Sequence, residues 1–337
     1  MTVPVAPDRP NQHNDLPGSS PAEPRFRPTP GPIAVAPEPL PLFVDAARAA
    51  GATVEPLSEA TRGLIWLSEQ RSDELAAILA AHPGIEWVQL PWAGVDGFGE
   101  LFANLDHDRA PVFTSAKGSY AEPVAEHALA LTLAVQREVP SKSRAAHWQS
   151  ERTGLSLFRN HVVIVGAGGI AVELLRLLEP FRVRTTVVRR AATSLDGATE
   201  TVTVDRLAEV LPTADVVVLA AASTGETRHL IGEGELALLP SHAVIINVAR
   251  GALIDDVALV EALRADRIWG AGIDVTEPEP LPADHPLWAE PRCVITSHSA
   301  DTPLMTKHLL ATRIERNVRA FLGGEPFVGL VDTRAGY

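Results

Sequence analysis

The hydrophobic residues alternate between short apolar runs and amphipathic stretches from Ile33 onward. In the first third of the chain, the apolar runs predict strands at 33–35, 63–67 and 85–90. The amphipathic stretches predict helices at 40–50, which Gly51 ends, and at 73–81, with Ser72 as the N-cap. Strands that alternate with helices are typical of a parallel sheet covered by helices on both faces.

The same alternation returns after a long apolar helix. This helix covers about 123–137 and carries Ala, Leu and Val on nearly every face, as is typical of helices buried between domains or subunits. The β-branched run Val162–Val165 then predicts a strand that is covered on both faces. Further strands are predicted at 184–188, 216–220, 244–248, 270–275 and 293–296, and a last helix at 302–321. The pattern therefore predicts two α/β domains, which the length of 337 residues also favours.

Residues 1–31 differ from the rest of the chain. Pro, Gly, Asn and Ser crowd this segment, and it has almost no periodic apolar pattern. Such a segment cannot bury enough apolar surface to offset the entropy of ordering it, so we expect a disordered tail. It also lacks the charged start, apolar run and cleavage site of a signal peptide, which predicts a cytoplasmic protein.

Charge and cysteine content exclude several classes of protein. The 29 Lys and Arg against 42 Asp and Glu give a formal charge of −13 without a dense basic run. This balance disfavours nucleic acid and anionic membranes as partners, and no apolar stretch is long enough to span a bilayer. Cys293 is the only cysteine, so the sequence predicts neither an intramolecular disulfide nor a cysteine-rich metal site.

A glycine-rich turn, Gly166-Ala167-Gly168-Gly169-Ile170-Ala171, comes directly after the strand at 162–165, and a helix follows from Val172. In a dinucleotide-binding turn the first glycine makes the bend, the second lets the backbone approach the pyrophosphate, and the third position needs only a small side chain. The helix N-terminus offers free N–H groups to the phosphates. We therefore expect Gly166, Gly168, Gly169 and Ile170 to bind NAD(P), although a tight turn without a ligand has the same pattern.

The end of the next strand bears on the choice of cofactor. Arg189 and Arg190 stand where an NAD-specific site usually has Asp or Glu for the ribose hydroxyl, and no acid occurs before Asp196. The two arginines favour NADP(H) over NAD(H), because they can bind a 2′-phosphate. A solvated strand end that binds nothing is the alternative interpretation.

Three further strands are each followed by an ionisable side chain. Arg250 follows the strand at 244–248, Asp274 lies near the end of the strand at 270–275 with Glu277 and Glu279 after it, and His298 follows the strand at 293–296. Open α/β sheets bind ligands at this carboxyl edge. Arginine can hold a substrate carboxylate bidentately, histidine can protonate a carbonyl oxygen as hydride arrives at carbon, and a carboxylate favours the imidazolium and orients its ring. The set predicts an oxidoreductase that moves a hydride between a nicotinamide and a small 2-keto or 2-hydroxy acid.

Across roughly Ile85 to Leu310, these ordered motifs resemble the D-isomer-specific 2-hydroxyacid dehydrogenase family. The resemblance implies that Arg250 binds substrate, that His298 is the acid/base, and that Glu279, directly before Pro280, is its partner rather than Glu277. It implies a Rossmann cofactor domain, 123–299, inserted in a flavodoxin-like substrate domain, 32–122 and 300–337, both with doubly wound parallel sheets.

The resemblance also assigns residues around both ligands. Asp274 would lie beside the nicotinamide carboxamide, and further cofactor contacts would come from Thr224, Val248 and Ala249. The Gly94-Val95 backbone would hold the substrate carboxylate, and the helix at 123–137 would form the interface of a homodimer.

Departures from the family pattern keep alternatives open. Ser297 replaces the usual proline before the histidine, Gly169 stands where Arg is common, and Ala222 replaces the proline of a Pro-Leu-Thr stretch. A regulatory protein that binds NAD(P) and catalyses weakly or not at all is therefore the main alternative. A formate-type dehydrogenase pairs its histidine with glutamine, so Glu279 argues against it.

Overall fold

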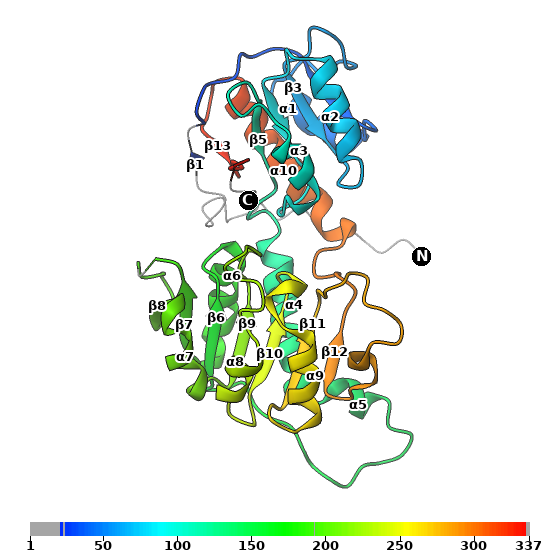
Figure 1. Ribbon diagram of the computed structural model, residues 1–337. Helices are drawn as coiled ribbons and strands as arrows, with labels where there is room; N and C mark the ends of the chain where they lie inside the picture. The colour runs from blue at the N-terminus through cyan, green and yellow to red at the C-terminus, as the bar shows by residue number, and fades with distance from the viewer. Residues whose placement is uncertain (1–20, 23, 192, 335–337) are drawn as a thin grey trace.

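Two separate parallel sheets organise the chain (Figure 1), and the computed structural model describes them within residues 21–22, 24–191 and 193–334. The larger sheet has seven strands in the order β12-β11-β10-β9-β6-β7-β8, all paired in parallel. Its strands are β6 (His161–Val165), β7 (Arg184–Arg189), β8 (Glu200–Thr203), β9 (Val216–Leu219), β10 (Val244–Asn247), β11 (Gly270–Ile273) and β12 (Cys293–Ile295). Because β9 returns beside β6, the chain reverses its winding there, as in a Rossmann domain.

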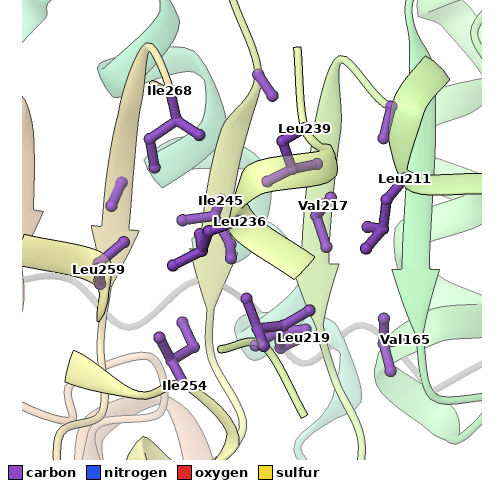
Figure 2. Packing of buried hydrophobic residues seen from close by; sticks show 14 of the residues in the cluster. Val165, Leu211, Val217, Leu219, Leu236, Leu239, Ile245, Ile254, Leu259 and Ile268 are labelled. Atoms are coloured by element: carbon purple, nitrogen blue, oxygen red, sulfur yellow. The ribbon is translucent and has the colours of Figure 1, made fainter. Parts of the chain in front are cut away.

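Helices cover both faces of this sheet. They are α4 (Ala121–Gln136), α6 (Gly169–Leu178), α7 (Leu207–Val210), α8 (Glu233–Leu238) and α9 (Asp256–Arg264), while the short α5 (Val139–Ser143) follows α4 and has no buried residue. Alternate strand residues such as Val162 and Ile164 pack toward α4 and α6. The intervening residues pack on the opposite face with Leu236 of α8 and Leu259 of α9, as Figure 2 shows. Burial on both faces explains the nearly continuous β-branched runs.

The smaller sheet has the order β2-β3-β4-β5. Its strands are β2 (Ile33–Ala36), β3 (Gly63–Trp66), β4 (Trp87–Gln89) and β5 (Val112–Thr114). Val54 forms a parallel bridge with Ile33 on the outer side of β2, so this sheet also reverses its winding and is flavodoxin-like. Its helices are α1 (Pro41–Ala49), α2 (Ser72–Ala81), α3 (Gly99–Ala103) and, from the other end of the chain, α10 (Pro303–Phe321).

The C-terminal helix completes the smaller domain. In Figure 1, α10 lies among the N-terminal elements, and its Phe321 ring stacks on Trp87 of β4 with ring centroids 5.1 Å apart. The larger domain is therefore inserted in the smaller one, as expected from the sequence. The domain boundaries at 122 and 300 remain our proposal, next to the starts of α4 and α10. Short 3-10 helices complete the description: η1 (Asp96–Phe98), η2 (Glu179–Phe181), η3 (Val204–Arg206), η4 (Leu211–Thr213), η5 (Gly251–Leu253) and η6 (Pro286–Ala289).

The segment that we expected to be a disordered tail is partly ordered. Residues 1–20 lie outside the described residues, but β1 (Pro21–Ala22) pairs antiparallel with β13 (Phe327–Val328). Pro28 is buried, and the Thr29 N–H donates to Glu86 Oε2 over 2.6 Å. The prediction of disorder is therefore wrong for the described part of 21–31. The segment pairs with a strand about three hundred residues away, and such long-range pairing leaves no periodic pattern in the local sequence.

Other differences are small and local. Ser72 is the first residue of α2 rather than its N-cap, which is Arg71, and no side chain caps this helix. The sequence patterns missed β5 and β8, since β5 has three residues and β8 is a half-exposed edge strand. Within the described residues, no helix is long and apolar enough to cross a membrane.

Candidate active site

The carboxyl edge of the seven-stranded sheet opens into a cavity of about 700 Å³ that both domains line. On the cofactor-domain side, residues within three positions of the ends of five strands contribute to its wall: Gly168, Ala220, Val248, Asp274 and His298. The smaller domain contributes the opposite wall through Glu69, Trp92, Gly94, Lys117 and Tyr120. The cavity thus lies at the edge where the sequence pattern predicted ligand binding.

The glycine-rich turn fits a dinucleotide phosphate. Gly166 has φ +115°, and a Cβ there would lie 2.5 Å from the Ala220 carbonyl oxygen, so only glycine fits. A Cβ on Gly168 would meet no atom within 4 Å, because this residue faces the open cavity. Helix α6 begins at Gly169 without a side-chain cap. Its first N–H groups are therefore available to an anion.

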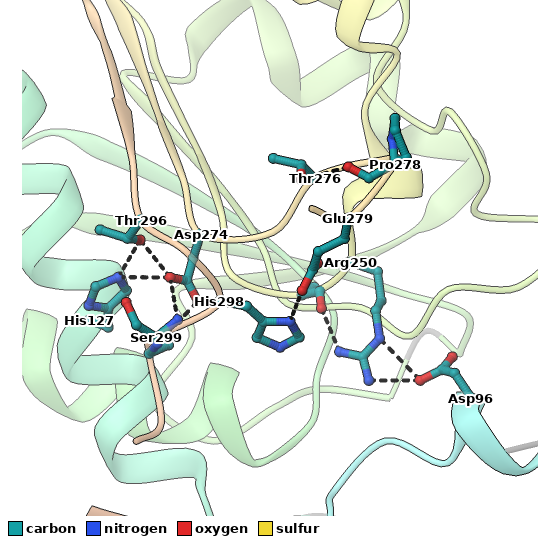
Figure 3. Close-up of polar contacts among 12 residues, drawn as sticks. Asp96, His127, Arg250, Asp274, Thr276, Pro278, Glu279, Thr296, His298 and Ser299 are labelled. Carbon is teal, nitrogen blue, oxygen red and sulfur yellow. Dashed lines mark hydrogen bonds and ion pairs between the residues drawn. The ribbon is translucent and has the colours of Figure 1, made fainter. Parts of the chain in front are cut away.

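Arg250 of the larger domain contacts Asp96 of the smaller domain (Figure 3). Its Nε and Nη2 donate to Asp96 Oδ2 over 3.1 and 2.7 Å, and its Nη1 donates to the Ala249 carbonyl over 2.7 Å. The guanidinium lies on Gly94, where a Cβ would be 1.9 Å from Nη2. A substrate held by Arg250 would therefore also meet the Gly94-Val95 backbone.

His298 and Glu279 form the second polar group of Figure 3. The His298 Nδ1 lies 2.6 Å from Glu279 Oε1, and both side chains are more than 40% exposed, at 42% and 44%. Since an ionised carboxylate only accepts hydrogen bonds, Nδ1 carries the proton and Nε2 is left for a ligand. Glu277, the rival carboxylate, instead pairs with Arg228 over 2.8 Å.

Asp274 is the buried carboxylate of the site. Its Oδ1 accepts from the Thr296 hydroxyl over 2.5 Å and from the Ser299 N–H over 3.0 Å, and its Oδ2 accepts from the Ala300 N–H over 3.1 Å. Burial opposes ionisation, but the hydrogen bonds from His127, Thr296 and Ser299 outweigh it and lower the pKa of Asp274 to about 2. Asp274 therefore stays charged at neutral pH.

His127 holds this carboxylate from helix α4. Its Nε2 lies 2.9 Å from Thr296 Oγ1 and 3.3 Å from Asp274 Oδ1. Because the Thr296 hydroxyl donates to Asp274, the His127 Nε2 must carry a proton, which it shares between Thr296 Oγ1 and Asp274 Oδ1. The sequence patterns did not indicate this link between His127 and Asp274.

The turn that carries His298 is strained and is held by Asp274. His298 has φ +46°, a left-handed conformation that costs a non-glycine residue about 1 kcal/mol. Its backbone N–H donates to the Asp274 carbonyl over 2.8 Å, and the next two N–H groups donate to the Asp274 carboxylate. The buried carboxylate thus compensates the strain in the turn.

A further carboxylate lies in the cavity wall three residues after His298. Burial raises the pKa of Asp301 to about 6, although the nearby His298 and Arg250 oppose the shift. Burial and Asp301 also raise the pKa of Tyr120 above its usual range, and the Tyr120 hydroxyl donates to the Pro91 carbonyl over 2.6 Å. This hydrogen bond holds the Tyr120 hydroxyl in the cavity wall.

The predicted site residues divide into two groups. Those that line the cavity are Gly94, Gly168, Gly169, Ile170, Val248, Arg250, Asp274 and His298. Those that lie outside its lining are Val95, Gly166, Arg189, Arg190, Thr224, Ala249 and Glu279. Glu279 still reaches the cavity through His298, and Arg189 lies at the end of β7, where its Nη1 donates to the Thr193 carbonyl over 3.2 Å. Within the described residues, no cluster of His, Cys, Asp or Glu could hold a metal ion.

Comparison with known proteins identifies the family. The family model described as the NAD-binding domain of D-isomer-specific 2-hydroxyacid dehydrogenases matches residues 128–300. The chain belongs to the D-isomer-specific 2-hydroxyacid dehydrogenase family. This confirms the resemblance that the ordered Arg, Glu and His motifs indicated. Members of this family are NAD(P)-dependent oxidoreductases.

Relatives cover most of this 2-hydroxyacid dehydrogenase chain. An uncharacterized protein in the proB 3′ region of Corynebacterium melassecola is 37% identical over 75% of this chain and 84% of its own length. A glyoxylate reductase of Aeropyrum pernix is 32% identical over 68% of this chain and 73% of its own length. The crystal structure of a D-isomer-specific 2-hydroxyacid dehydrogenase from Xanthobacter autotrophicus Py2, in complex with NADPH and MES, superposes with a TM-score of 0.76 at 27% identity, covering 92% of this chain and all of that one.

Several residues of the site in this family member escaped the sequence patterns. Glu69 and Lys117 line the cavity from the smaller domain, and Asp96 binds Arg250. Thr296 connects His127 to Asp274. Each lies in a loop or at a strand end without a motif of its own, so only the arrangement of the two domains reveals it.

Proposed function

We propose that this protein reduces small 2-keto acids, such as glyoxylate or hydroxypyruvate, to D-2-hydroxy acids, with His298 as acid/base, Glu279 as its partner and Arg250 as the substrate-binding arginine. The observation that carries the proposal is that His298, bonded to Glu279, lines the same cavity as Arg250. His298 can then reach the keto oxygen of a 2-keto acid while Arg250 binds its carboxylate.

The proton transfer follows from how His298 is held. When bound, the nicotinamide supplies the hydride to the carbonyl carbon. His298 enters the reduction as the imidazolium: its Nδ1–H stays bonded to the Glu279 carboxylate, and its Nε2–H donates the proton to the carbonyl oxygen. Carbon receives the hydride and oxygen the proton, so C=O becomes CH–OH. In the oxidative direction, Nε2 accepts the proton.

Substrate binding rests on Arg250, which lines the same cavity as His298. Arg250 has N–H donors that can hold the substrate carboxylate bidentately, and its guanidinium lies on Gly94. The Gly94-Val95 backbone would share this carboxylate. For the cofactor we propose Gly166, Gly168, Gly169 and Ile170 around the pyrophosphate, and Thr224, Val248, Ala249 and Asp274 nearer the nicotinamide.

We also propose that NADP(H) is preferred over NAD(H). Arg189 is the last residue of β7 and Arg190 follows it, and no carboxylate stands there to bind a ribose hydroxyl. Arginine suits a 2′-phosphate because it is always charged and binds phosphate through a fork of donors. The similar structure from Xanthobacter autotrophicus contains NADPH.

A substrate panel tests the function and the cofactor together. Oxidation of NADPH and of NADH is followed with glyoxylate, hydroxypyruvate and pyruvate, and the Kd of each cofactor is measured. We expect turnover with at least one acid and a higher kcat/KM with NADPH. The variant Arg189→Ala,Arg190→Ala should reduce the preference for NADPH, while Arg182→Ala, an exposed arginine before the same strand, should not. Tight cofactor binding without turnover of any acid would instead favour a regulatory protein.

We further propose a homodimer with α4 and the following loop at its interface. Large apolar side chains are exposed in this region: Val139 is 51% exposed, Trp148 93% and Phe158 57%. In Figure 1 the loop before β6 extends away from the sheet. Apolar groups gathered on an extended loop are typical of an interface. Sedimentation should give a dimer for the wild type and a weaker dimer for Trp148→Ser, and a monomeric wild type would contradict this proposal.

A further inference from the structure

Asp96 and Arg250 join the two domains at the point where we propose that substrate binds. Asp96 belongs to η1 of the smaller domain, and Arg250 follows β10 of the larger one. The Asp96 carboxylate uses one oxygen, Oδ2, to accept from both Nε and Nη2 of Arg250. These two donors form one edge of the guanidinium plane.

The hydrogen bonds of Arg250 can be counted. A guanidinium has five N–H groups, one on Nε and two on each terminal nitrogen. Asp96 takes the Nε group and one on Nη2, and the Ala249 carbonyl takes one on Nη1. One N–H therefore remains on each terminal nitrogen. Two N–H groups on neighbouring nitrogens are what a bidentate carboxylate requires.

The loop of Asp96 reinforces this arrangement. Asp96 directly follows Gly94-Val95, and Gly94 is the residue on which the guanidinium lies. A side chain at Gly94 would displace Nη2, and a shift of η1 would break both bonds from Asp96. The same short segment thus contacts Arg250 through its backbone and through its carboxylate.

We infer that Asp96 is a positioning residue: it holds the guanidinium of Arg250 against Gly94 so that the remaining pair of N–H groups is presented to the substrate carboxylate. The inference rests on the proposed function and deepens it. Asp96 does not compete for the substrate, because it occupies a different edge of the guanidinium. It also links substrate affinity to the contact between the two domains.

Charge attraction alone is not sufficient for this role. The side chains of Asp96 and Arg250 are 56% and 36% exposed, and an exposed ion pair is weak in water. The contribution of Asp96 lies in orientation, since a free arginine side chain samples many rotamers and must lose that freedom when it binds substrate. A substitution that keeps an acceptor at this position should therefore retain part of the effect.

Binding of oxamate, which resembles a 2-keto acid and carries one carboxylate, tests the inference by calorimetry on the cofactor-loaded protein. Asp96→Ala should weaken oxamate binding and raise the KM of the keto acid by about tenfold. This change is larger than the few-fold contribution of an exposed ion pair to affinity and smaller than the ~100-fold cost of a misplaced binding group. The kcat and the Kd of NADPH should stay unchanged. Asp96→Asn keeps an acceptor oxygen and should recover part of the affinity. Glu100→Gln, which removes an exposed charge from the adjoining α3, is the matched control and should have no effect.

A double-mutant cycle excludes a merely structural effect. In an Arg250→Ala background, Asp96→Ala should cause no further loss of oxamate affinity, because its only route to the substrate is gone. Unchanged or tighter oxamate binding in Asp96→Ala would overturn the inference. The proposed function would still stand in that case if the wild type reduces keto acids. A wild type that neither binds oxamate nor reduces any keto acid would overturn both.

Discussion

Two pairs of histidine and carboxylate lie in neighbouring parts of this site and differ in their surroundings. Glu279 and His298 are more than 40% exposed and are 2.6 Å apart. Asp274 is buried, and His127, at 3.3 Å, reaches it together with Thr296. The exposed pair leaves one imidazole nitrogen facing a cavity, whereas the buried carboxylate is surrounded by donors.

This difference indicates that the exposed pair transfers the proton and that the buried pair supports the structure of the site. A proton donor must face its substrate and change its charge during turnover, which the exposed Glu279–His298 pair permits. The hydrogen bonds around Asp274 keep it ionised and fix the turn in which His298 has its left-handed backbone. Residue types alone do not assign these roles, because both pairs contain the same two groups. Burial and the number of donors distinguish them.

The largest expected effect is on the exposed pair. His298→Asn should lower kcat by about 10²–10⁴-fold, the usual contribution of general acid catalysis. The free energy of unfolding and the Kd of NADPH should remain close to the wild type, since this side chain is half exposed. Steady-state kinetics and calorimetry measure the two properties separately. Full activity in His298→Asn would reject the proposed assignment of the acid/base.

The next effect belongs to the buried pair and concerns stability. The lowering of the Asp274 pKa from 3.8 to about 2 corresponds to about 2 kcal/mol. A depressed pKa stabilises the folded state above the unfolded pKa, and this contribution is lost as the pH falls toward the folded value. Asp274→Asn should therefore lower the free energy of unfolding by about 2 kcal/mol at pH 7, and the difference should shrink between pH 4 and pH 2.

Denaturant titrations at pH 7 and near pH 3 measure this dependence. Glu279→Gln is the matched control from the exposed pair, and its effect on unfolding should stay within about 0.5 kcal/mol at both pH values. An equal loss of stability in the two variants would contradict the division between a supporting and a catalytic pair. A loss in Asp274→Asn that does not depend on pH would reject the ionised state of Asp274.

The same contrast explains what the sequence could predict. Arg250, Asp274 and His298 each stand at or just after the end of a predicted parallel strand, and open α/β sheets bind ligands at the carboxyl edge of their strands, so their convergence was predictable. The fold followed from the same alternation. The bond between Asp96 and Arg250 was not predictable, because it joins residues 154 positions apart in different domains. The pairing of β1 with β13 was missed for the same reason, as neither two-residue strand has a periodic pattern.

The smallest expected effect concerns His127, the outer member of the buried pair. His127→Phe removes the N–H that donates to Thr296, but Thr296, Ser299 and Ala300 still donate to Asp274. We expect the free energy of unfolding to fall by about 1 kcal/mol, the net value of one hydrogen bond, and kcat to change only a few-fold. His127→Gln keeps a donor and should restore part of the stability, while Glu126→Gln, exposed on the same helix, is the control. If His127→Phe instead reduced kcat as strongly as His298→Asn, the buried pair would take part in proton transfer, because loss of support alone does not account for so large a change in rate.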